Sequence, residues 1–153
     1  MTTSTATIPR TVVSGGHDHE HTTMAVVWGL VAGVVNAAAP FAIWWIDAAT
    51  VHALIVSLIA AVYVGFAVAD GRPRVIAVEC TITVIFVLVA ATAVTATPWL
   101  IVAAYAAHGL KDLWQHRHQF VAGTRWWPPF CATIDGLVAA IVTVEIIAGL
   151  KFR

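Results

Sequence analysis

Five apolar stretches make up most of this chain, and each is long enough to cross a lipid bilayer as a helix. A membrane helix needs about 20 mostly apolar residues, because each residue rises about 1.5 Å through a hydrocarbon core about 30 Å thick. The stretches run over residues 24–46, 51–69, 75–95, 98–116 and 129–150. The sequence therefore predicts an all-α fold, a polytopic bundle of five transmembrane helices.

The composition agrees with this prediction. Hydrophobic residues make up 60% of the chain and charged residues 10%, whereas a soluble domain carries about a quarter charged residues. The formal net charge is zero, so no overall field attracts nucleic acid, and we expect none as a partner. The expected environment is the lipid bilayer of the inner cell membrane.

The start of the chain differs from the rest. Residues 1–23, rich in Thr, Ser and Gly, predict a disordered N-terminal tail ahead of a membrane domain that comprises residues 24–153. The tail contains HDHEH, whose side chains His17, His19 and His21 can hold a divalent metal ion weakly. The alternative is a solvated tail without a ligand.

Aromatic and basic residues indicate where the spans end and how they are oriented. Because five spans put the termini on opposite sides, six Lys and Arg residues share the N-terminal side and two lie opposite. The positive-inside rule therefore predicts a cytoplasmic N-terminus and an external C-terminus. All seven tryptophans lie near predicted span ends, as expected at membrane interfaces: Trp28, Trp44, Trp45, Trp99, Trp114, Trp126 and Trp127.

Small residues recur four positions apart in the first two spans. Gly29, Gly33 and Ala37 form one stripe, and Ala61 and Gly65 belong to another. Such stripes let helix backbones approach closely, which is how membrane helices associate. We expect both stripes to pack within the bundle, and a homodimer face is the alternative.

Several ionisable residues lie inside the predicted spans, where they need a partner, a water-filled cavity or a function. Counting about 1.5 Å per residue puts Glu79, His108 and Asp135 at comparable depths in the cytoplasmic half. His108, Asp112 and His116 are spaced four apart, so they form a ladder on one face of the fourth span.

This set of residues has two chemical interpretations. Imidazole and carboxylate groups bind divalent ions such as Zn, Fe or Mn, and they equally form a proton relay. One helix supplies too few metal ligands, so we expect Glu79 and Asp135 to complete a shell with His108, Asp112 and His116. The alternative is structural: Asp112 pairs with a neighbouring basic residue, and the buried groups only hydrogen-bond one another.

A second polar group lies in the outer half of the predicted bundle. Glu145 belongs to the fifth span, and Asp47 and His52 lie at the start of the second. With Asn36 between them, the two groups can mark a path across the membrane. The alternative is that they are separate local pairs.

Two stretches near the C-terminus resemble a known pattern. HGLKDLWQH (108–116) and RWWPPFCATIDG (125–136) resemble HGxxDxxxH…WWPxFCxxxD, which is found in an uncharacterised family of small bacterial integral membrane proteins. The resemblance covers the C-terminal third of the chain and implies a membrane fold without an established activity. It implies these signature residues: His108, Asp112, His116, Trp127, Pro128, Cys131 and Asp135.

The sequence supports three functional hypotheses. In the first, a small multi-pass protein uses the His/Asp/Glu site to bind a metal ion or to relay protons in a transport or redox process. In the second, the chain is a non-catalytic accessory or scaffold subunit, as a homo-oligomer or within a larger membrane complex. In the third, the bundle binds an apolar ligand or a lipid. No motif decides whether the protein is an enzyme.

Overall fold

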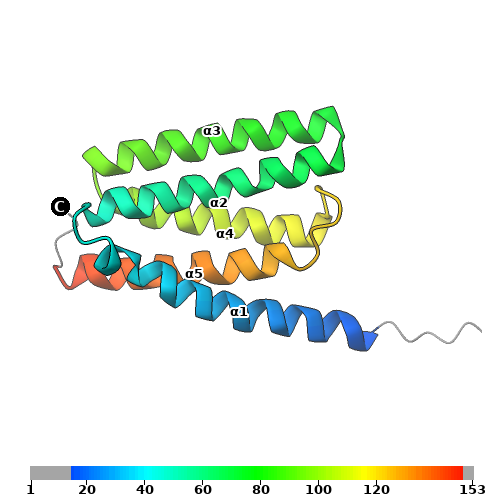
Figure 1. Ribbon diagram of the computed structural model, residues 1–153, viewed down its shortest axis with the longest axis horizontal. Helices are drawn as coiled ribbons and strands as arrows, with labels where there is room; N and C mark the ends of the chain where they lie inside the picture. Colours follow the sequence, from blue (N-terminus) through cyan, green and yellow to red (C-terminus); the bar gives the residue numbers. More distant parts are fainter. Residues whose placement is uncertain (1–14, 150–153) are drawn as a thin grey trace, which may run out of the picture.

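The computed structural model describes the backbone of residues 15–149 and the side chains of residues 20–149. In this part of the chain every regular element is a helix, so the prediction of an all-α fold is confirmed. Five helices run up and down in turn and form one bundle (Figure 1). They are α1 (Gly15–Ala42), α2 (Ala48–Asp70), α3 (Pro73–Thr95), α4 (Trp99–His118) and α5 (Trp127–Ile147).

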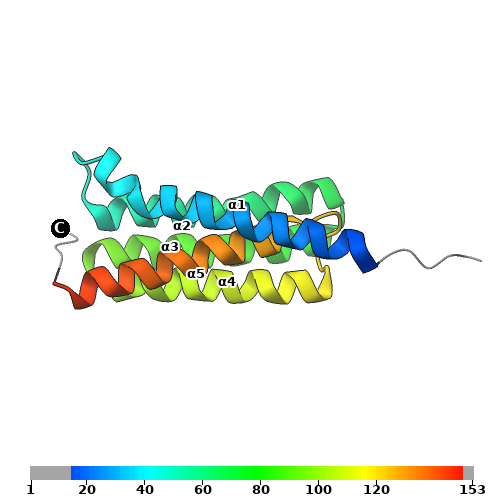
Figure 2. The ribbon, with the colours of Figure 1, turned by 90° about the horizontal axis from the view of Figure 1, so that it is seen from below.

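Helix α4 has neighbours on several sides. It packs along α5 and also contacts α2 and α3, while α1 packs on α5 and α2 packs on α3 (Figures 1 and 2). Helix α1 contacts α2 only sparsely. Because the helices alternate in direction, α1 begins at one end of the bundle and α5 finishes at the other (Figure 1).

Four of the five helices are long and apolar enough to cross a membrane. These are α2, α3, α5 and the segment Glu20–Ala42 of α1. Helix α4 does not reach this composition because it carries polar residues such as His108, Asp112 and Gln115. These three side chains are buried, so the polar residues of α4 face the other helices.

The bounds of α1 differ from the prediction at both ends. The helix begins at Gly15, so residues 15–23, which the sequence assigns to a disordered tail, are helical; residues 1–14 lie outside the described part. Residues 15–23 extend a helix that is already nucleated, so each adds a hydrogen bond without the cost of a new nucleus. The Glu20 side chain is exposed. At the other end the helix stops at Ala42 instead of continuing to residue 46, soon after Pro40, which lacks the N–H of an internal helical hydrogen bond.

The two stripes of small residues have different surroundings. Gly29, Gly33 and Ala37 are buried, and both glycines face α5 at close range. Ala61 and Gly65 are exposed, and a Cβ at Gly65 would meet nothing within 4 Å. The second stripe therefore does not pack within the bundle, contrary to the expectation, because α2 turns its opposite face towards the other helices.

Two apolar clusters lie on either side of the level at which the polar side chains are buried. The larger includes Ala53 and Val56 of α2 together with Val138 and Val142 of α5. The smaller is built around Tyr63 of α2 and includes residues from α3 and the connection between α4 and α5. The His108 ring lies where the clusters meet, because it is close to Tyr63 of the smaller cluster and to Phe86, which packs against the larger one.

Candidate ion site in the bundle

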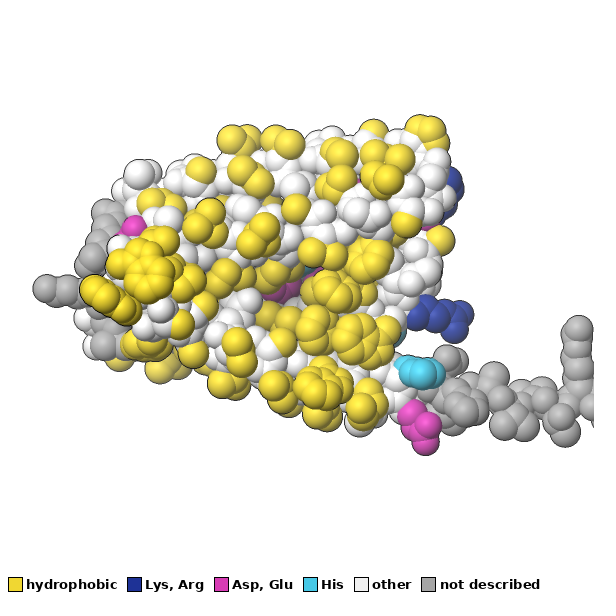
Figure 3. Space-filling view, in the orientation of Figure 1, with side chains coloured by type: hydrophobic (Ala, Val, Ile, Leu, Met, Phe, Trp, Pro, Cys, Tyr) yellow, Lys and Arg dark blue, Asp and Glu magenta, His cyan; other side chains and the backbone are white. Residues whose placement is uncertain are grey.

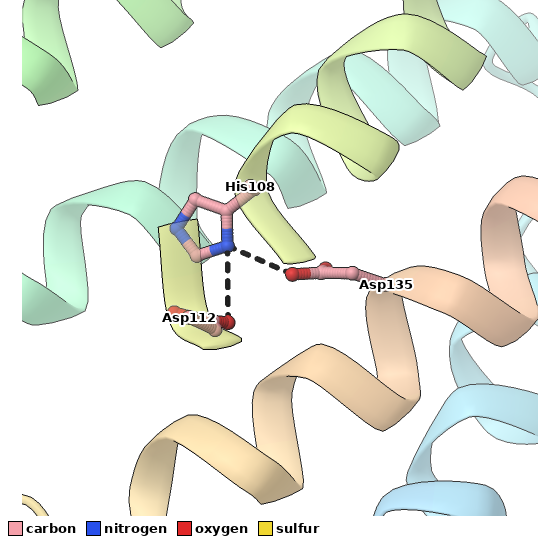
Figure 4. Close-up of side chains that lie close together, drawn as sticks. All are labelled: His108, Asp112 and Asp135. Atoms are coloured by element: carbon pink, nitrogen blue, oxygen red, sulfur yellow. Dashed lines mark hydrogen bonds and ion pairs between the residues drawn. The ribbon is translucent and has the colours of Figure 1, made fainter. Parts of the chain in front are cut away.

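His108, Asp112 and Asp135 meet inside the bundle (Figure 4). Nδ1 of His108 lies 2.8 Å from Oδ2 of Asp135 and 3.4 Å from Oδ2 of Asp112. His108 is 1% exposed and both aspartates are 0% exposed. One ligand atom from each residue lies within 4.8 Å of the other two, and no other three His, Cys, Asp or Glu side chains in the described part do so.

A close approach of two helices creates this contact. His108 and Asp112 are one turn apart on α4, which puts both on one face, and Asp135 comes from α5. Between them on α4, a Cβ at Gly109 would lie 3.3 Å from Cβ of Asp135. The absence of a side chain at Gly109 therefore lets α4 lie close enough to α5 for the histidine to reach Asp135.

A second buried pair joins α3 to α4. Nζ of Lys111 lies 2.9 Å from Oε2 of Glu79, and the same ammonium lies 3.4 Å from the centroid of the Tyr63 ring. The sequence predicts Glu79 as part of the shell around His108, but its carboxylate pairs with Lys111 instead. The reason is electrostatic, because a buried carboxylate is most strongly stabilised by the cation nearest to it.

Together these groups contain more carboxylates than cations. Glu79 and Lys111 neutralise each other, and a protonated His108 neutralises only one of the two aspartates. Oδ1 of Asp112 and Oδ1 of Asp135 lack a hydrogen-bond partner among the described residues, and Oδ2 of Asp112 has only its 3.4 Å contact with Nδ1 of His108. Since an uncompensated buried charge costs several kcal/mol, the site needs one further positive charge, either a proton or a metal ion.

The other nitrogen of His108 faces a different environment. The imidazole centroid lies 5.1 Å from that of Phe86 and 6.0 Å from that of Tyr63, and Nε2 has no hydrogen-bond partner in the described part. Histidines that bind a metal usually use one ring nitrogen for the ion and donate the other N–H to a carboxylate or carbonyl. Here both carboxylates share Nδ1 while aromatic rings flank the imidazole, an arrangement that favours a shared proton.

The remaining predicted ligands lie elsewhere. His116 is half-buried and lines a shallow pocket with His21 and Arg117 at the end of the bundle. The neighbouring His118, which the sequence does not predict as a ligand, is exposed. In place of His116, Gln115 is the buried residue of the last turn of α4. The side chains of His17 and His19 lie outside the described residues, so the proposed tail site stays a prediction.

A second set of polar groups is formed by Asn36 and His52, which the sequence predicts, and by Tyr105, which it does not. The Tyr105 hydroxyl donates to Oδ1 of Asn36 at 3.3 Å and lies 3.4 Å from Nδ1 of His52. Tyr105 is 0% exposed, and it lies within electrostatic range of Asp135. Neither Tyr105 nor Lys111 was predicted as a site residue. The available signal was their spacing, because each lies three residues from His108 on α4.

No protein-family model, no curated protein and no solved structure matches the chain. The resemblance over residues 108–136 therefore stays a prediction.

Proposed function

We propose that the bundle is embedded in the inner cell membrane, with all five helices crossing it and the N-terminus in the cytoplasm. The distribution of side chains supports this, because large apolar residues lie outside while ionisable ones lie inside. Val35, Leu58 and Val144 are 67%, 68% and 65% exposed, whereas Glu79, Asp112 and Asp135 are at most 1% exposed. Lipid solvates the former and excludes the latter.

Reporter fusions test this orientation. A reporter that functions only outside the cytoplasm should be active when fused after Arg153 and silent when fused at Gly123, because α5 separates the two positions. The reverse pattern would contradict the orientation, and activity at both positions would contradict the number of spans.

For the site itself, we propose that His108, Asp112 and Asp135 bind and relay protons in a transport process. The observation that carries this proposal is the position of Nδ1 of His108 against two fully buried carboxylates. A proton on the histidine and another shared by the aspartates would neutralise the set. Because imidazole gains and loses a proton near neutral pH, it is suited to pass protons on.

Further polar groups extend this site towards both ends of the bundle. On one side, Tyr105 contacts Asn36 and His52, one helical turn from His108 on α4. On the other side, Gln115 is fully buried near the end of α4. One turn of helix corresponds to a rise of about 5 Å, which a bridging water can span. These residues supply steps of a path across the bundle.

A divalent metal ion is the second candidate for the same site. Its support is that ligand atoms of His108, Asp112 and Asp135 lie within 4.8 Å of one another. Two ionised aspartates with a neutral histidine would balance such an ion in charge. Metal analysis of the purified protein separates the candidates, because the metal hypothesis requires one equivalent of metal that is lost in Asp135→Asn.

Proton flux into liposomes tests the relay. With an imposed potassium diffusion potential and a trapped pH-sensitive dye, the wild-type protein should acidify the lumen faster than protein-free liposomes do. His108→Phe should reduce the rate to that of protein-free liposomes, because its ring has no proton to exchange. His118→Phe is the matched control and should retain the wild-type rate. Equal rates for wild type and His108→Phe would contradict the relay.

A further inference from the structure

A groove of about 730 Å³ opens where α1 diverges from α2. Its walls come from α1, from Ile55 of α2, and from Trp126 and Phe130 at the start of α5. This volume is within the range of sites that hold drug-sized ligands. The surrounding surface is apolar, so in a bilayer the groove would open sideways into lipid (Figure 3).

The groove is aromatic as well as apolar. Trp28 lines it and is 54% exposed, and the rings of Trp126 and Phe130 stack with centroids 4.8 Å apart. Aromatic faces attract cations as well as apolar groups, most strongly where water is excluded. The lining therefore suits an apolar molecule that carries a positive charge.

Asn36 links the groove to the ion site. It is the one lining residue with an amide side chain, and its Oδ1 accepts from the Tyr105 hydroxyl. Tyr105 lies one helical turn from His108 on α4, and His108 contacts Asp135. Figure 3 shows acidic side-chain atoms on the floor of a hollow in the middle of this hydrophobic face.

The charges at this level define the complementary ligand. In the His108–Asp112–Asp135 site and the adjoining Glu79–Lys111 pair, three groups are acidic and two, His108 and Lys111, can be cationic. His52 lies outside this set, on the far side of the Tyr105 hydroxyl. The site thus has one carboxylate more than its own cations can neutralise. A proton supplies the missing charge in the proposed relay, and an organic cation in the groove can supply it instead.

We propose that the groove between α1 and α2 binds a lipophilic cation from the bilayer, with its charge directed towards Asn36 and the Asp112–Asp135 carboxylates. This inference rests on the proposed function, because the same surplus carboxylate holds the proton. It names the substrate class of that site as an apolar molecule of drug-like size with one positive charge.

Tetraphenylphosphonium and tetraphenylborate test the proposal, because they share a shape and differ in the sign of charge. In equilibrium dialysis with the purified full-length protein, the cation should bind and the anion should not. Trp28→Ala should weaken cation binding about tenfold through the lost aromatic contact. Trp44→Ala, which changes an exposed tryptophan outside the groove lining, should leave it unchanged.

Asp135→Asn should also weaken binding of the cation about tenfold. Equal binding of the two probes, binding of neither, or equal affinity in wild type and Trp28→Ala would overturn the proposal. An infrared band from a protonated carboxylic acid reports on the proton site without any ligand. If the band is present and the cation does not bind, only the groove proposal fails; selective binding without the band contradicts only the proton site.

Discussion

Lys111→Met is expected to destabilise the protein by about 3–5 kcal/mol, the usual cost of removing one partner from a buried ion pair. Methionine has a similar length, so the change removes the charge and leaves little empty space. The carboxylate of Glu79, which is 1% exposed, would then have no cation within ion-pair distance. The measurement is the free energy of unfolding of the purified protein in detergent.

A double variant separates loss of charge from loss of packing. Adding Glu79→Gln to Lys111→Met removes the orphaned charge, so most of the lost stability should return. Arg74→Met is the control, since Arg74 is exposed at the start of α3. If the double variant is as unstable as Lys111→Met, the pair is not an ion pair in the folded protein and the charge balance proposed for the site is wrong.

Gly29→Ala is expected to lower the free energy of unfolding by about 1–3 kcal/mol, because the added methyl group has no space. A Cβ at this position would lie 2.7 Å from the carbonyl oxygen of Phe130 and 2.8 Å from Cβ of Thr133. The first neighbour belongs to the backbone of α5 and cannot rotate away, so α1 must move off α5. Thermal unfolding should show a clear fall in midpoint temperature.

Gly65→Ala is the matched control in this experiment. It places the same methyl group on a transmembrane-type helix where nothing lies within 4 Å. Its midpoint should stay at the wild-type value or rise slightly, because alanine favours helix over glycine. Similar losses for both variants would show that the close contact of Gly29 with α5 does not determine stability.

Helix periodicity and depth predicted much of the candidate site. His108 and Asp112 share a face because they are four residues apart, and Asp135 lies at the depth that counting along its helix gives. Lys111 was harder to predict, because a lysine near the end of a span is expected to extend its ammonium to water. Its burial depends on Glu79 and Tyr63 facing it from other helices.

The surroundings of the small-residue stripes could not be predicted either, because they too depend on which residues of other helices face them. Spacing of four residues shows that Ala61 and Gly65 share a face with one another, but not which face of α2 meets another helix. Helix α2 has apolar residues on all sides, so hydrophobicity gives no direction. In α1, the close fit of Gly29 and Gly33 against α5 depends on the residues of α5 opposite them.

The central claim is that the surplus buried carboxylate of the His108–Asp112–Asp135 site carries a proton. Infrared spectroscopy of the metal-free protein at neutral pH measures this directly. The account predicts a carboxylic-acid C=O band that shifts in D₂O, disappears in Asp112→Asn and persists in Asn36→Leu. Absence of the band in the metal-free wild-type protein would contradict the claim.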